Sequence, residues 1–261
     1  MSISAAHAQP IAQQQITQAT VIPAPIGGMD GRINAAKNDP NICLWAINMV
    51  PAEYGMRVRN GYRDWQIGLG DEVRTVIPFN GSAAAAQTPD RIFVATRDGI
   101  YDVTTAGGTP VNKLMFATVD DDSGFGVYIH YVDEAGNDLI YYADEANGLF
   151  KYDPVLDTWA QATGITAKAG SINTVTISEI NYIVQHKLRL WFITKNANHA
   201  WYLPIRASQG EATEFFFAQK FKHGGSLVGL YNWTVDGGNG RDDNLVAIGR
   251  GGDVIPWTGE D

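Results

Sequence analysis

Residues 90–104, DRIFVATRDGIYDVT, predict two short strands that meet at a tight turn. The first strand, residues 92–96, is almost entirely apolar and β-prone, and the second, residues 100–104, begins apolar and contains Tyr101 and Val103. Asp98 followed by Gly99 between such runs is typical of a hairpin, because a type I′ turn needs positive φ at both central residues. The stretch therefore predicts a β-hairpin with a type I′ turn.

The same pattern recurs three times further along the chain. Its copies are residues 138–153 (DLIYYADEANGLFKYD), 188–204 (LRLWFITKNANHAWYLP) and 244–259 (NLVAIGRGGDVIPWTG). Their expected turns lie at residues 147–148, 196–198 and 251–252. Counted from Ile92, Leu139, Leu190 and Leu245, the steps are 47, 51 and 55 residues. A period near 50 residues with a hairpin in every copy indicates a repeat architecture.

Further strands are expected on both sides of these hairpins. One precedes each hairpin, at residues 73–79, 126–132, 174–184 and 226–235, and one follows the first three, at residues 113–118, 158–162 and 214–219. Four antiparallel strands per repeat are typical of a propeller blade, whereas a long β-sandwich is the alternative. The repeated turn position favours an all-β fold, a β-propeller of four-stranded antiparallel blades with an extended N-terminal arm.

The expected domains are an arm and ring- or channel-contact segment at residues 1–55 and a propeller of about four blades at residues 56–261. Residues 1–28 are rich in Gln, Ala, Thr and Pro and cannot bury enough surface to fold alone. They are either a frayed tail or an arm that orders against a neighbouring subunit. Residues 56–69 are expected to form a strand, which either supplies the strand that the last blade lacks or leaves that blade incomplete.

Composition excludes several classes of protein. The chain is 45% hydrophobic with a net charge of −9, which argues against binding nucleic acid by releasing counterions. Its single cysteine, Cys43, rules out an internal disulfide and is expected to be a core residue. No run of 18 apolar residues is present, so we expect no membrane span. The N-terminus lacks the pattern of a signal peptide, so we expect no secretion.

Motifs for catalysis or metal binding are not found. The sequence contains no G-x-S-x-G, and its histidines show no metal-type spacing. We expect these histidines at turns or strand surfaces: His7, His130, His186, His199 and His223. The sequence thus predicts no catalytic residue, no cofactor and no metal site.

Three groups of residues have a functional and a structural interpretation. Pairs of carboxylates support glycoside hydrolysis in several propellers, but aspartates also cap turns. Residues 236–243, DGGNGRDD, carry oxygen ligands suited to Ca²⁺ but depart from the EF-hand pattern, so a surface turn is favoured. Aromatic side chains stack on sugars, but those within strands are expected between blades. The carboxylates are Asp120, Asp121, Asp122, Asp133, Asp236 and Asp243, and the aromatic residues are Trp191, Trp201, Tyr202 and Trp257.

A series of short motifs resembles the tail nozzle, or hub, proteins of short-tailed bacteriophages. The resemblance covers Pro23 to Gly259, and the order and spacing of the motifs agree with that family. The motifs are PAPIGGM (residues 23–29), NMVP (48–51), RVRNGY (57–62) with Trp65, GL (68–69), VRT (73–75) and GIYDVT (99–104).

The resemblance implies a virion structural protein of the tail, not an enzyme. Such proteins form a homo-oligomeric ring, expected here to be a hexamer, below the portal and head-to-tail adaptor. They extend the DNA-ejection channel and contact a tail fibre or spike, and DNA passes without specific binding. An acidic wall suits this because it repels phosphate. The alternatives are a glycan-binding or glycan-cleaving propeller and an intracellular scaffold propeller.

Overall fold

The computed structural model describes residues 25–32, 34–53, 55–81, 89–236 and 241–258. The chain divides into two compact units, Met1–Arg63 and Asp64–Asp261. We call them the N-terminal unit and the propeller unit. The expected arm at residues 1–28 lies almost entirely outside the described residues.

The N-terminal unit is held together by backbone pairing. A 3₁₀ turn, η1 (Ala35–Lys37), precedes an antiparallel pair of strands, β1 (Met49–Ala52) and β2 (Gly55–Val58). The strand expected at residues 56–69 therefore ends at Val58 and pairs with β1. The expectation that this strand completes the last blade stays a prediction.

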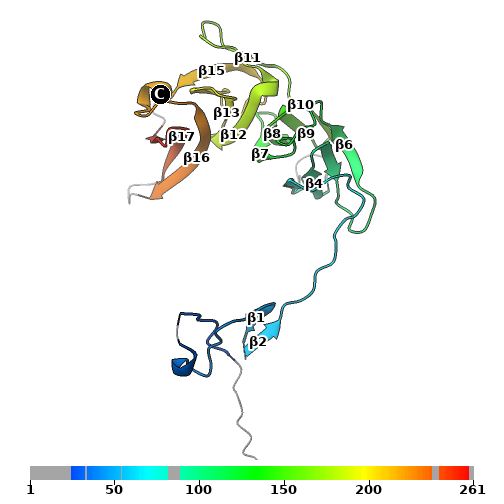
Figure 1. Ribbon diagram of the computed structural model, residues 1–261. Coiled ribbons are helices and arrows are strands. Elements are labelled where there is room, and N and C mark those ends of the chain that lie inside the picture. Colours follow the sequence, from blue (N-terminus) through cyan, green and yellow to red (C-terminus); the bar gives the residue numbers. More distant parts are fainter. Residues whose placement is uncertain (1–24, 33, 54, 82–88, 237–240, 259–261) are drawn as a thin grey trace, which may run out of the picture. The chain divides into compact units, whose positions relative to one another are not determined.

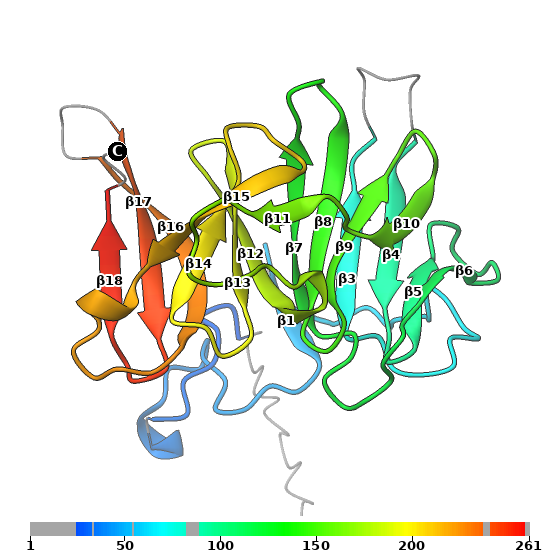
Figure 2. The same ribbon diagram turned by 90° about the horizontal axis from the view of Figure 1, so that it is seen from above.

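The propeller unit consists of four antiparallel sheets that follow one another along the chain. They lie side by side in an arc, with the first and fourth at opposite ends (Figures 1 and 2). The first sheet contains β3 (Thr75–Phe79), β4 (Arg91–Ala95), β5 (Gly99–Asp102) and β6 (Val111–Met115). The second contains β7 (Gly126–Val132), β8 (Asp138–Asp144), β9 (Gly148–Asp153) and β10 (Thr158–Gln161).

The third and fourth sheets vary this plan. The third has β12 (Ile180–His186), β13 (Arg189–Thr194), β14 (His199–Tyr202) and β15 (Gly210–Phe216), with β11 (Ile165–Ala167) added parallel to β15. Two further 3₁₀ turns are η2 (Ile177–Glu179), just before β12, and η3 (Ala218–Lys220). The fourth contains β16 (Leu227–Asp236), β17 (Arg241–Gly249) and β18 (Val254–Trp257).

This arrangement confirms the propeller-blade prediction. Each sheet is a meander of consecutive strands, and the first strands of neighbouring sheets, β3, β7, β12 and β16, contact each other in sequence. A sandwich would instead consist of two sheets packed face to face, whereas here four sheets pack on one another in succession. The chain is thus all-β and built of four-stranded antiparallel propeller blades, with three strands in the fourth sheet among the described residues.

Inner sheets bury both faces, as the apolar runs in their strands predict. In β8, Ile140 and Tyr142 pack in the cluster shared with the first sheet, whereas Tyr141 and Ala143 pack in the cluster shared with the third. The side chains alternate between faces because successive residues of a strand point in opposite directions. Each sheet is therefore stabilised mainly by its neighbours.

The predicted type I′ turn is wrong, although the hairpin is where we expected it. Neither Asp98 nor Gly99 has a positive φ. The Asp98 carboxylate instead accepts hydrogen bonds from the hydroxyls of Thr96 and Tyr101. Gly99 is required for space, because a Cβ atom there would overlap the carbonyl oxygen of Leu114 on β6. Side-chain capping and close strand approach replace the turn geometry that the dipeptide indicates.

Candidate functional site

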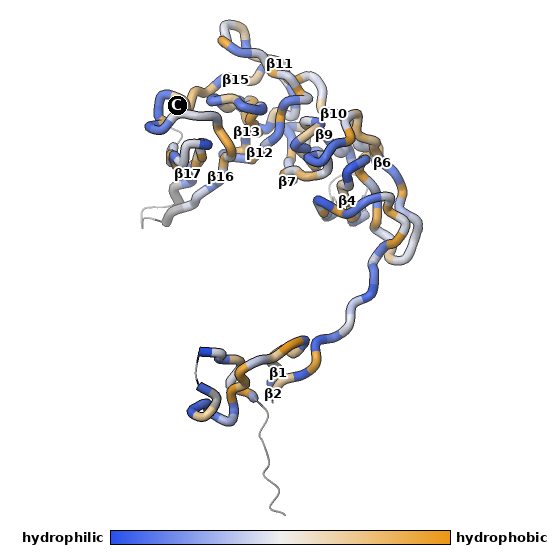
Figure 3. The backbone as a smooth tube through the Cα atoms, viewed as in Figure 1, coloured by the Kyte–Doolittle hydropathy of each residue, from blue (hydrophilic) through white to orange (hydrophobic). Residues whose placement is uncertain are grey.

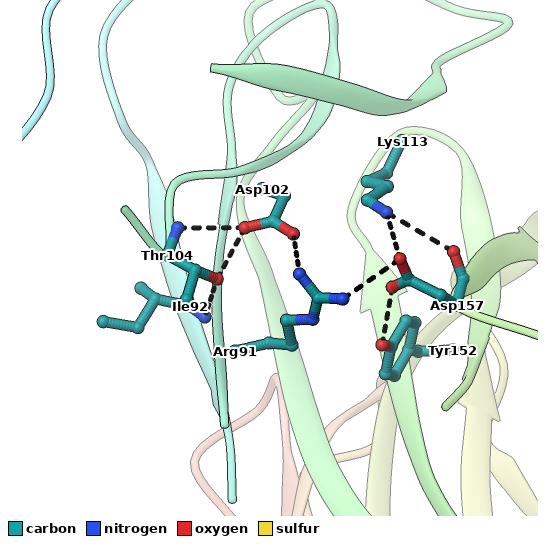
Figure 4. A network of polar contacts seen from close by, with 7 residues as sticks. All are labelled: Arg91, Ile92, Asp102, Thr104, Lys113, Tyr152 and Asp157. Carbon is teal, nitrogen blue, oxygen red and sulfur yellow. Dashed lines mark hydrogen bonds and ion pairs between the residues drawn. The ribbon is translucent and has the colours of Figure 1, made fainter. Parts of the chain in front are cut away.

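The most extensive ionic network of the described residues joins the first sheet to the second (Figure 4). Arg91 on β4 contacts Asp102 at 3.1 Å and Asp157, in the turn after β9, at 3.3 Å. The ammonium group of Lys113 on β6 lies 2.7 Å from the same Asp157 carboxylate. Two cations from one sheet thus converge on a single carboxylate of the next.

Neighbouring hydroxyls satisfy the remaining oxygen atoms of this network. Tyr152 donates to Asp157 at 2.9 Å, and Thr104 donates from its backbone amide and its hydroxyl to Asp102. Burial alone would raise the pKa of Asp157, but the bonds from Lys113 and Tyr152 keep it below its usual value. Burial and the adjacent carboxylate raise the pKa of Tyr152, so it stays protonated. The ionised groups are paired with one another, and the network holds the first sheet against the second.

A second polar cluster lies at the same boundary and is buried. Asp144, at the end of β8, accepts hydrogen bonds from the backbone amides of Gly124, Ala146 and Asn147. The side-chain amide of Asn147 in turn accepts from the Thr118 backbone amide at 2.8 Å and donates to the Thr118 carbonyl at 3.0 Å. The cluster therefore fixes the connection between the first and second sheets.

Polar contacts also link the later sheets. Tyr141 on β8 donates to the carbonyl oxygen of Ser208 at 2.6 Å, which ties the second sheet to the third. His186 on β12 lies 2.8 Å from Asn232 on β16, which ties the third to the fourth. Because the Asn232 amide donates to the Gln185 carbonyl, its oxygen faces His186, which must donate from Nδ1. Burial lowers the pKa of His186, so the ring is neutral.

Among the aspartates weighed as paired catalytic carboxylates, Asp120 and Asp133 cap turns, whereas Asp243 makes a cross-strand contact within the fourth sheet. Asp120 accepts from the amides of Asp122 and Ser123, and Asp133 accepts from Asn137. Asp243 accepts from the Thr234 hydroxyl at 2.7 Å. Of the 236–243 stretch weighed as a calcium loop, residues 237–240 lie outside the described residues, and the others belong to the ends of β16 and β17.

A glycosidase would combine paired carboxylates and aromatic rings in one cavity, but here they line two different cavities of the propeller unit. A polar cavity of about 290 Å³ is lined by Asp120, Asp122 and Glu145, together with Lys195 and Arg250, and no tryptophan lines it. A second cavity, of about 160 Å³, lies between the third and fourth sheets and is lined without a carboxylate. Its lining consists of His186, Lys187, Arg189, Trp191, Tyr202, Ile205 and Trp257.

The rings of this aromatic cavity belong to the packing between sheets. Trp191 lies 4.6 Å from Tyr202 and 5.3 Å from Trp257 between ring centroids, and Arg189 lies over the Tyr202 ring at 5.2 Å. Trp191 is buried, and so is Trp201, which packs in the core between the second and third sheets. The aromatic residues thus occupy the predicted positions between blades, although Tyr202 and Trp257 are only half-buried.

Other residues depart from their predicted environments. His186 and His199 are buried within strands, not placed at turns or strand surfaces, because each sits on a strand face covered by a neighbouring element. His130 and His223 are exposed, and His7 lies outside the described residues. Cys43 is only partly buried and not in a core, because none of the residues described around it in the N-terminal unit is buried.

The N-terminal unit displays apolar side chains without burying any. None of its residues with a described environment is buried, and Trp45 and Tyr62 are 77% and 91% exposed. Figure 3 shows that the chain around β1 is strongly hydrophobic. We call the following set the apolar surface of this unit: Ile26, Met29, Trp45, Ile47, Val58 and Tyr62.

A largely apolar groove lies on the outward face of the first sheet of the propeller unit. It measures about 360 Å³ and lies opposite the face that packs on the second sheet. The Trp65 indole spans part of it and donates to the Val103 carbonyl at 2.8 Å. We call it the first-sheet groove; it is lined by Asp64, Trp65, Gln66, Leu69, Val73, Val76, Ile92, Val94 and Val103.

Within the described ranges, no group of three or more His, Cys, Asp or Glu side chains is arranged to hold a metal ion. The described helices are too short to cross a bilayer. No family model matches the chain, and no curated protein matches it significantly. A solved structure of the dihydro-heme d1 dehydrogenase NirN in complex with DHE is similar, with a TM-score of 0.42 and 11% identity. The match covers 81% of this chain and 43% of that one, and we transfer nothing from it.

Proposed function

We propose that this chain is a structural subunit of a phage tail, a nozzle or hub protein that assembles into a ring. The ring would extend the DNA-ejection channel below the portal and adaptor and would anchor a tail fibre or spike. The chain's work in this proposal is mechanical, and no residue of it is catalytic. Its net charge of −9 supports passage of DNA, because an acidic wall repels phosphate.

The observation that carries the proposal is that no residue of the N-terminal unit is buried among those whose environment the structure describes. A folded segment that buries no side chain gains little from the hydrophobic effect, so it needs a surface outside itself. Assembly into a larger particle supplies such a surface. The polar clusters of the propeller unit support the same conclusion, since Arg91, Asp144 and Asp157 are engaged in holding sheets together.

Electron microscopy tests this proposal directly. We expect the purified full chain, or particles of the phage that encodes it, to show a ring with a central channel wide enough for duplex DNA. Antibodies against the chain should label the tail of those particles. Labelling of the capsid alone, or particles that lack the chain altogether, would overturn the proposal.

Glycan binding is the second candidate, and the aromatic cavity favours it. Trp257 and Tyr202 are only partly buried there, and aromatic rings of this kind stack on sugars. Cleavage is disfavoured, because the carboxylates Asp120, Asp122 and Glu145 line a different cavity. A glycan array would test this candidate. Binding that the Trp257→Ala variant loses would support it, and an array without signal would exclude it.

A further inference from the structure

The N-terminal unit combines an exposed apolar surface with positive charge. It contains five Lys and Arg residues against three Asp and Glu, whereas the propeller unit contains fourteen against twenty-five. Arg57, Arg59 and Arg63 lie on or just after β2 and are all exposed. They flank Val58 and Tyr62 of the apolar surface. A partner for this unit should therefore present an apolar depression with an acidic rim.

The first-sheet groove has those properties. Its lining is largely apolar, and Val73 and Val76 remain exposed in it. Asp64 lines the groove, and Asp71 is exposed on the segment between two lining residues, Leu69 and Val73. The face is also the one that a further blade would cover in a propeller.

We propose that the N-terminal unit of one copy packs on the first-sheet groove of a second copy of this chain. Trp45 and Tyr62 then bury their rings against Val76 and its neighbours, and Arg57 and Arg59 face Asp64 and Asp71. This contact is heterologous, so its repetition produces a closed ring or an open filament. The inference rests on the proposed function, because it takes from it the ring of identical subunits. The two surfaces that meet in that ring are the N-terminal unit and the first-sheet groove.

Sedimentation velocity over a range of concentrations tests the contact in the full chain. Wild-type protein should associate as its concentration rises, and Trp45→Ala should weaken association at least roughly tenfold, as expected for a buried aromatic anchor. Arg57→Glu with Arg59→Glu should have a similar effect, which lessens in high salt because the attraction is screened. The matched control is Lys37→Glu, which reverses an exposed charge on η1 away from β2 and should associate like wild type.

A charge swap between two copies identifies the groove. One variant carries Arg57→Glu and Arg59→Glu, and the other carries Asp64→Lys and Asp71→Lys. Each variant alone should remain largely monomeric, because like charges meet. Their mixture should recover association, because each N-terminal unit then finds a groove of opposite charge on the other variant. Circular dichroism of each variant shows whether the fold is intact.

Each other outcome overturns the inference. If wild-type protein stays monomeric, the unit packs on its own propeller or on a different protein. If the mixture does not recover association although both variants fold, the partner surface is not the first-sheet groove. Either result leaves the proposed function standing when microscopy still places the chain in a tail ring. Absence of the chain from tails removes the proposed function whatever the mixture does.

Discussion

The backbone amide of Gly124 donates a hydrogen bond of 2.7 Å to the carboxylate of Asp144, which is fully buried. Gly124 lies just before β7 and Asp144 ends β8, and these two ends are adjacent because the strands are antiparallel, with Gly126 opposite Asp144. The bond holds the connection from the first sheet against the second. The same carboxylate accepts from Ala146 and Asn147, so it organises the hairpin turn as well. One side chain thus couples a turn to a boundary between sheets.

Removing this carboxylate should be costly. Asp144→Ala leaves the buried backbone amides of Gly124 and Asn147 and the partly buried amide of Ala146 without their acceptor, and we expect it to lower the free energy of unfolding by about 3 kcal/mol. The matched control is Asp153→Ala, which removes a cap from the more exposed amides of Val155 and Leu156 and should cost about 1 kcal/mol or less. Urea unfolding measures both. Equal losses would show that Asp144 is an ordinary turn cap.

Gly99 should resist substitution for steric reasons alone. Gly99→Ala places a Cβ atom against the Leu114 carbonyl, so we expect a loss of about 1–3 kcal/mol from overpacking. Gly70→Ala is the control, because its Cβ atom would meet nothing closer than an Asp98 oxygen at 3.8 Å and its φ is not positive. Thermal unfolding of both variants checks this expectation. A Gly99→Ala protein as stable as Gly70→Ala would contradict the close approach of β5 and β6.

The ion pairs at Asp157 should couple measurably. A double-mutant cycle of Lys113→Ala and Asp157→Ala is expected to give an interaction free energy of roughly 1 kcal/mol, because both groups are only partly shielded from water. The cycle for Arg97 and Asp121, which lie 3.7 Å apart and are more exposed, should give a smaller value. A larger interaction free energy for Arg97 and Asp121 than for Lys113 and Asp157 would contradict this expectation.

Stability should fall below neutral pH because of His186. Burial lowers its folded-state pKa below 6.5, so below pH 6.5 the unfolded chain takes up a proton that the folded chain refuses. The loss begins as pH falls through 6.5, grows by at most about 1.4 kcal/mol per pH unit, and stops below the folded-state pKa. His186→Gln should flatten this slope while keeping a donor for Asn232. An unchanged slope between pH 7 and 5 would contradict a buried neutral ring.

Asp157 should add a separate loss in acid. Its folded-state pKa lies below its usual value, so its contribution is present above about pH 4 and is lost as pH falls further. Asp157→Asn should therefore be less stable than wild type at pH 7 and closer to it at pH 2. Chemical denaturation at the two pH values measures the difference. The same difference in unfolding free energy at both pH values would show that the charge of the carboxylate does not contribute to stability.

The amino-acid sequence alone determined the class of fold. Hairpin positions follow from short-range patterns, because the two apolar runs of each hairpin and the turn residues between them lie within about fifteen residues of each other. Apolar runs such as those in β8 and β13 also indicated sheets buried on both faces. These signals are short-range, so they survived in the structure even where the turn type differed, as at Asp98 and Gly99.

Only the tertiary structure decided which residues meet. Arg91 and Asp157 are 66 positions apart, and no spacing in the sequence pairs them. Cys43 was expected in a core, yet no described residue packs over it tightly enough to bury it. His186 was expected at a surface but is buried by the fourth sheet. Such contacts depend on which sheet faces come together, and that choice is made by long-range packing, which local sequence patterns do not encode.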